Sequence, residues 1–179
     1  SGFHTDPVGL LLSHRADWAI VSEVEQNDDV LFKPLFSYEM VGICSKDHPL
    51  ANKDVWLAED FAEETWVTYP VPDDMLDLYR QVLKPKGINP PRRTTELTIA
   101  LIQLVASRRG IATVPYWAAL PYLEKGYVVA RKITEEGLYS NLYAAIRKED
   151  ANLAYIEDFH QTVKAQSFST LPGLSVLEL

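Results

Sequence analysis

The chain has 179 residues, and its 17 lysine and arginine side chains against 25 aspartate and glutamate side chains give a formal net charge of −8. The basic residues are scattered, which argues against a nucleic-acid-binding surface within the chain. Cys44 is the only cysteine, so neither an intramolecular disulfide nor a cysteine-rich metal site can form. No stretch approaches the roughly 20 apolar residues of a membrane span, and no secretory signal begins the chain. We therefore expect a cytoplasmic protein.

The first half of the chain alternates short helical and extended patterns. Thr5, Asp6 and Pro7 indicate a helix start, because capping side chains precede a proline at an early helical position, and a helix of about ten residues is expected. Apolar runs at residues 18–21, 30–36 and 39–44 are predicted to be strands, the first of them buried in a parallel sheet. Residues 58–63 and 73–83 have helical patterns, and residues 65–69 have a strand pattern.

The most informative stretch runs from Glu96 to Pro115. Residues 97–106 form a predicted helix that is apolar on nearly every side and ends in a basic turn followed by Gly110. Residues 111–114 are β-branched or small, so they predict a buried strand that Pro115 terminates. Since its own sheet covers only one side of this helix, we infer that a partner subunit covers the other.

The remaining pattern predicts a helix at residues 117–124, strands at 127–133 and 139–147, and a helix at 152–165, before a tail with apolar anchors. Strands that alternate with helices predict an α/β fold with parallel sheets covered on both faces. The length suffices for one compact domain or for two small lobes. Because we find no flexible linker, two lobes would be joined by strands that pass between them.

Four short motifs occur in the order and spacing of one protein family. They are HRADWAI at residues 14–20, HPLA at 48–51, VASRRGIATVP at 105–115 and LEKG at 123–126. In this succession they resemble the effector-binding domain of LysR-type transcriptional regulators. Five further runs, at residues 6–12, 36–44, 68–72, 89–93 and 171–173, resemble the members of this family that regulate methionine biosynthesis genes.

The resemblance implies a two-lobed fold like that of type 2 periplasmic binding proteins, with a cleft between two α/β lobes and two strand crossovers. Lobe one would comprise residues 1–37 and 139–179, and lobe two residues 38–138. A full-length family member has a winged helix-turn-helix, a linker helix, and the first strand and helix of lobe one ahead of the point where this sequence begins. We therefore expect lobe one to lack its first strand and helix, and DNA binding to need a domain absent from this chain.

The narrower resemblance implies that homocysteine binds in the cleft as a coactivator, without a cofactor. Such a ligand needs a carboxylate site, an ammonium site and an apolar wall, and helix N-termini offer free N–H groups for a carboxylate. Glu96 is the candidate partner of the ammonium group. The predicted effector-binding residues are His4, Thr5, Thr68, Tyr69, Pro70, Thr95, Glu96 and Tyr116. For each residue taken singly, a helix cap or a solvated turn is the alternative interpretation.

The resemblance also implies a homodimer, and a tetramer in the full-length protein, in which lobe one of one subunit packs antiparallel on lobe two of the next. Two helices, near residues 8–12 and 97–105, are the predicted interface. Its side chains are Val8, Leu11, Leu12, Leu97, Leu101 and Val105. We therefore expect Leu101→Glu to disrupt the dimer.

Two other function classes fit the sequence less well. An enzyme would need a nucleophile with a base, paired carboxylates or a metal set, and none stands out. A solute-binding protein of a transport system shares the fold but would carry an export signal. His14, His48 and His160 are predicted to be surface or turn residues rather than metal ligands, because no pair has ligand spacing on one element. Cys44 lies in an apolar strand and is predicted to be a buried, inert thiol rather than a redox sensor.

Overall fold

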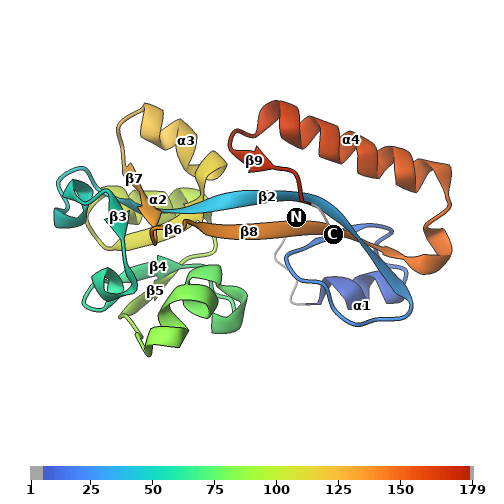
Figure 1. Cartoon of the computed structure of the whole chain (residues 1–179), viewed down its shortest axis with the longest axis horizontal. Helices are drawn as coiled ribbons and strands as arrows, with labels where there is room; N and C mark the ends of the chain where they lie inside the picture. Colours follow the sequence, from blue (N-terminus) through green and yellow to red (C-terminus); the bar gives the residue numbers. More distant parts are fainter. Residues whose placement is uncertain (1–5, 178–179) are drawn as a thin grey trace. The chain divides into compact units, whose positions relative to one another are not determined.

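A computed structural model describes residues 6–177, and residues 1–5 and 178–179 lie outside the described part. The chain divides into two units, Ser1–Tyr38 with Ser140–Leu179 (unit 1) and Glu39–Tyr139 (unit 2). Each boundary lies within one residue of the lobe boundary that the resemblance implies. The boundaries fall inside β2 (Val30–Cys44) and near the start of β8 (Leu138–Arg147), so these two strands join the units (Figure 1).

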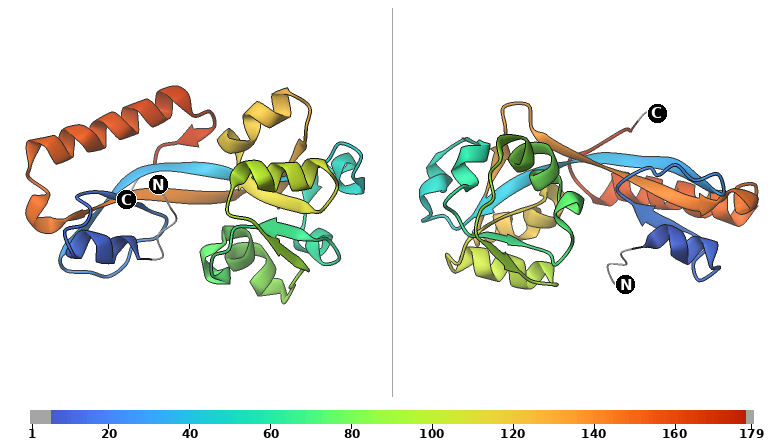
Figure 2. Two further views of the ribbon diagram at one scale, coloured as in Figure 1. Left: turned by 180° about the vertical axis from the view of Figure 1, so that it is seen from behind. Right: turned by 90° about the horizontal axis from the view of Figure 1, so that it is seen from below.

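Unit 1 is a small antiparallel sheet with a helix on each face. α1 (Pro7–Leu12) and α4 (Ala154–Thr170) flank its strands from opposite sides (Figures 1 and 2). β1 (Ala19–Val21) pairs with β8, and β9 (Leu174–Ser175) pairs with β2. The core under α1 consists of Val8, Leu11, Val21, Val30 and Ala145. A single turn, η6 (Lys148–Asp150), leads from β8 toward α4.

Unit 2 contains the parallel part of the sheet. β4 (Trp66–Thr68) lies between β5 (Arg92–Thr94) and β6 (Ile111–Pro115), and it runs parallel to both. β2 pairs antiparallel with β6 and with β7 (Val129–Ile133), and β3 (Val55–Trp56) pairs parallel with β7. The sheet is therefore mixed, which corrects the expectation of purely parallel sheets. Parallel neighbours are joined by a crossover connection, usually a helix. β2 comes from unit 1 without such a connection, so it can run antiparallel to its neighbours.

Both faces of the unit-2 sheet are covered. On one face, α2 (Thr98–Ala106) and α3 (Tyr116–Glu124) pack on a core that includes Val41, Ile43 and Val67. On the other face, β3 and a series of short turns surround Trp56 and Trp66. The turns are η1 (Pro49–Asn52), η2 (Ala58–Phe61), η3 (Asp73–Met75), the π-helix η4 (Tyr79–Leu83) and η5 (Lys84–Lys86).

Several predicted elements differ in length or continuity. The expected helix at residues 73–83 is broken into short turns, because the backbone of Leu76 is extended. The runs at residues 30–36 and 39–44 form one continuous strand, β2. α4 continues to Thr170, beyond the expected end at residue 165.

Two helix ends also depart from the expectation. α1 has only six residues, since the backbone of His14 turns left-handed, with φ 55°. After α2, Arg108 is left-handed, with φ 59°, and Gly110 also has a positive φ, of 150°. Gly110 is needed for space, because a Cβ atom there would lie 2.3 Å from the carbonyl oxygen of Thr65. No helix within residues 6–177 combines the length and the apolar character that a membrane crossing requires.

Candidate functional site

The carboxyl ends of β4, β5 and β6 meet at one edge of the unit-2 sheet, because the three strands are parallel. α2 begins a few residues after β5, and α3 begins directly after β6. Within the described chain, neither helix start carries a side-chain cap, so the N–H groups of the first turns lack intrahelical partners. Ligand sites of open α/β sheets lie at such an edge, and these N–H groups suit an anionic group.

A chain of hydrogen bonds fixes the loop after β4 beside the start of α2. The Thr68 side chain is buried, and its hydroxyl donates to the carbonyl oxygen of Tyr69 (3.1 Å), which also accepts from the N–H of Val71 (2.9 Å). The N–H of Thr95 donates to the carbonyl oxygen of Thr68 (3.0 Å). The hydroxyls of Tyr69 and Thr98 are hydrogen-bonded at 2.7 Å. This network therefore joins three of the residues predicted from the sequence, Thr68, Tyr69 and Thr95.

Thr98 is the member of this network that is not among the residues predicted from the sequence. It is the first residue of α2, and the cluster of threonines at residues 94, 95 and 98 was the available signal. Tyr116 begins α3 and is half-buried against the same apolar cluster as Tyr69. Pro70 and Glu96 belong to the same edge, but both side chains are exposed. His4 and Thr5 lie outside the described residues.

The six predicted interface residues fall into two groups. Val8 and Leu11 are buried in the core of unit 1, and Leu101 and Val105 are fully buried under α2 in unit 2. These four side chains are occupied by the chain's own core, so Leu101→Glu would damage folding rather than report on a dimer. The other two side chains, Leu12 and Leu97, are 42% and 63% exposed and are free to meet a partner. That these helices form an interface stays a prediction.

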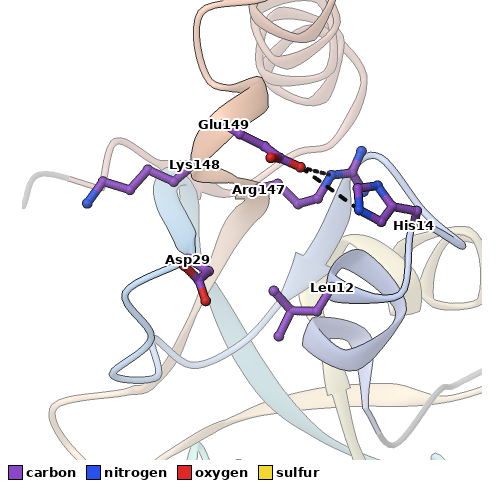
Figure 3. Close-up of a pocket in the computed structure, with 6 residues that line it drawn as sticks. All are labelled: Leu12, His14, Asp29, Arg147, Lys148 and Glu149. Atoms are coloured by element: carbon purple, nitrogen blue, oxygen red, sulfur yellow. Dashed lines mark ion pairs between the residues drawn. The ribbon is translucent and has the colours of Figure 1, made fainter.

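A pocket in unit 1 is lined by Leu12, His14, Asp29, Arg147, Lys148 and Glu149 (Figure 3). The guanidinium of Arg147 donates to the carbonyl oxygens of Leu11 (2.9 Å) and Ala16 (2.6 Å), and it pairs with Asp17 and Asp150. The hydrogen bond with Asp17 makes the largest contribution to raising the pKa of Arg147, which keeps it charged. Arg147 thus holds the end of α1 against β8, and we interpret the pocket as the surface of a structural ion cluster.

The burial of Cys44 and the positions of His14 and His48 agree with the expectation, whereas that of His160 does not. Cys44 is fully buried, as predicted, and burial raises the pKa of its thiol to about 11. His14 is exposed, and His48 is the N-cap residue of η1, with its imidazole 3.2 Å from a carboxylate oxygen of Glu64. His160 is not at the surface: it lies buried on α4, and burial lowers its pKa. Among residues 6–177, no group of three or more histidine, cysteine or acidic residues could hold a metal ion.

Comparison with known proteins identifies relatives along the whole chain. A family model described as LysR substrate binding domain matches residues 1–167. The HTH-type transcriptional regulator MetR of Haemophilus influenzae is 86% identical over 179 residues, which cover 100% of this chain and 58% of that protein. MetR of Escherichia coli K12 is 35% identical over 178 residues, covering 99% of this chain and 56% of that protein. The chain thus spans little more than half the length of these relatives.

Comparison with solved structures identifies the same family. The regulatory domain of MetR, a LysR family regulator from N. meningitidis, is 66% identical with a TM-score of 0.93, and the match covers 99% of this chain and 82% of that chain. The effector binding domain of QuiR, solved in complex with shikimate, has a TM-score of 0.72 at 24% identity, covering 89% of this chain and 77% of that one. These matches confirm the predicted α/β fold of the periplasmic-binding-protein type. The relatives are transcriptional regulators, which confirms that the chain is not an enzyme and disfavours the transport alternative.

Proposed function

The chain belongs to the LysR family as the substrate-binding domain of a regulator, and on this premise we propose that it senses homocysteine for a regulator of methionine biosynthesis genes. The observation that carries the proposal is its similarity, along the whole chain, to MetR proteins. In this role homocysteine is a coactivator and no cofactor takes part.

The edge of unit 2 supplies the chemistry that such a ligand needs. The N–H groups in the first turns of α2 and α3, which have no acceptor within their own helix, suit its carboxylate. The ring of Tyr116 offers an apolar wall, and the hydroxyls of Tyr69 and Thr98 stand beside the α2 start. Because these two hydroxyls already bond each other, the site is preorganised, which lowers the entropic cost of binding.

In the whole protein, we propose that a region outside this chain contacts DNA. Two observations support this: the relatives are named HTH-type transcriptional regulators, and the chain covers 58% or less of their length. Effector binding would bias the conformation of the effector domain, and the assembly would pass that bias to the DNA-binding domains. A regulator that acts on DNA would work in the cytoplasm.

We also propose that the chain forms a homodimer, and a tetramer in the full-length protein, through the exposed sides of α1 and α2. Leu97 and Ile99 are 63% and 56% exposed near the start of α2, and Leu12 is exposed at the end of α1. Leu97→Glu and Ile99→Glu are expected to lower the mass measured by light scattering. The matched control is Val24→Glu, at an exposed apolar residue outside both helices. A mass that stays dimeric in both α2 variants would rule out this interface.

Isothermal titration calorimetry tests the effector assignment. Reduced homocysteine is titrated into the chain, with methionine and cysteine as controls. We expect saturable heat with homocysteine and weaker binding of both controls. Equal binding of all three amino acids, or binding of none, would refute homocysteine as the effector.

A further inference from the structure

Glu39 lies at the same edge of unit 2 as the starts of α2 and α3. In the antiparallel pair of β2 and β6, Met40 is opposite Pro115. Glu39 precedes Met40 on β2, and Tyr116, the first residue of α3, follows Pro115, so both residues lie one step beyond this pair. Glu39 therefore adjoins the candidate site, although nothing near it in the sequence marks it as a ligand-binding residue.

The alternation of β2 decides which face Glu39 occupies. Val41 and Ile43 are buried in the core beneath α2 and α3, whereas Met40 and Cys44 pack in the core on the opposite face. Side chains on a strand alternate between the two faces, so Glu39 shares the face of Val41 and Ile43. This is the face from which Tyr69 and Tyr116 approach the same edge.

Glu39 is a partly buried residue, and within residues 6–177 its carboxylate has no hydrogen bond or ion pair. Partial burial strengthens its attraction for a cation, because solvent screens it less than a fully exposed charge. Glu96, the acidic residue selected from the sequence, is exposed beside the same edge. Of the two carboxylates, Glu39 is thus the better placed to bind a ligand ammonium group.

We propose that Glu39 binds the ammonium group of the effector, which restricts the site to ligands with an α-amino group. This inference rests on the proposed function as an amino-acid sensor. The ligand carboxylate then lies toward the helix starts, and its ammonium group toward β2. A zwitterion matches this arrangement, because the helix starts provide positive partial charge for its carboxylate and Glu39 on β2 provides negative charge for its ammonium group.

The test compares two ligands and two matched variants by titration calorimetry. The ligands are homocysteine and 4-sulfanylbutanoate, which is homocysteine without its amino group. The variants are Glu39→Gln and Glu96→Gln, which each remove one negative charge at nearly constant volume. Glu39→Gln is expected to weaken homocysteine binding by about tenfold or more, the usual effect of losing a charge-assisted hydrogen bond. Glu96→Gln is expected to change it by less than about threefold, as for an exposed charge.

The deaminated ligand separates a lost contact from a damaged site. Glu39→Gln is expected to leave the affinity for 4-sulfanylbutanoate unchanged, and both variants should keep the thermal midpoint of the wild type. An equal loss for both ligands, or an unchanged affinity for homocysteine, would overturn the role of Glu39. If the wild type binds methionine or cysteine more tightly than homocysteine, homocysteine is not the effector. The role of Glu39 is then tested by the same comparison, with the preferred amino acid and its deaminated analogue as the two ligands. If no amino acid binds, both proposals fail.

Discussion

Leu101→Ala is expected to destabilise unit 2 because Leu101 is at the centre of the core between α2 and the sheet. Its side chain is fully buried, and the same core contains Ile102, Val105, Val114 and Ala119. The family resemblance instead implies that Leu101 belongs to a subunit interface. In that case truncation would weaken the dimer and leave the fold of the subunit intact, so the two interpretations predict different outcomes.

The expected loss follows from the atoms removed. The substitution deletes three buried carbon atoms, which costs about 2.4 kcal/mol at about 0.8 kcal/mol per buried methylene. The cavity left behind adds to this cost, which places the total at about 3 to 4 kcal/mol. For a chain of this size, that loss lowers the thermal midpoint by about 6 to 16 °C.

Urea unfolding followed by tryptophan fluorescence measures this loss. Three of the four tryptophans, Trp56, Trp66 and Trp117, belong to unit 2, so the signal reports mainly on that unit. The control is Leu57→Ala, the same change in the same unit at a side chain that is 46% exposed. It is expected to cost less than about 1 kcal/mol. A loss in Leu101→Ala no larger than that of the control, or one that depends on protein concentration, would refute the burial argument.

Three further predictions concern single polar groups. Tyr69→Phe and Thr98→Val each remove the same hydrogen bond, so each is expected to cost about 1 kcal/mol of stability, and the double variant no more than either single one. Burial lowers the pKa of His160, so the unfolded chain binds a proton that the folded chain does not. The free energy of unfolding is thus expected to fall as the pH drops below about 6.5. This loss is expected to be smaller in His160→Gln, and as large as in the wild type in the exposed control His14→Gln. Burial raises the pKa of the Cys44 thiol to about 11, so iodoacetamide at pH 8 is expected to label it only after unfolding.

Each of these has a result that would contradict it. Additive losses in the double variant would show that Tyr69 and Thr98 do not act as a pair. Identical stability between pH 7 and 5.5 for the wild type and His160→Gln, measured by urea unfolding, would refute the role of His160. Labelling of native Cys44 at the rate of the unfolded chain, followed by mass spectrometry, would show that the thiol is accessible.

Elements whose signals lie within a few residues could be predicted. Asp6 caps α1 by accepting the N–H of Gly9 at 2.7 Å, and β6 ends at Pro115, as the local pattern indicated. The helix at residues 98–106 also agrees, because a long apolar run between clear end signals leaves little choice. The failure at residues 73–83 has a non-local origin. Arg92, on β5, pairs with Asp73 and stacks on Trp66 and Tyr79, so a distant strand shapes the segment.

The same division applies to α2 and to the candidate site. Composition established that α2 is apolar, but only packing decided that Leu101 faces the core and Leu97 faces solvent. Thr68 and Thr95 meet because β4 and β5 are neighbours in the sheet, and Glu39 lies at the edge where α3 begins because Met40 pairs with Pro115. The sequence by itself therefore determined the family, the fold class and most helices and strands, since local propensity and motif spacing encode them. The tertiary structure alone decided which side chains share the site, because strand order and register between distant segments have no local signature.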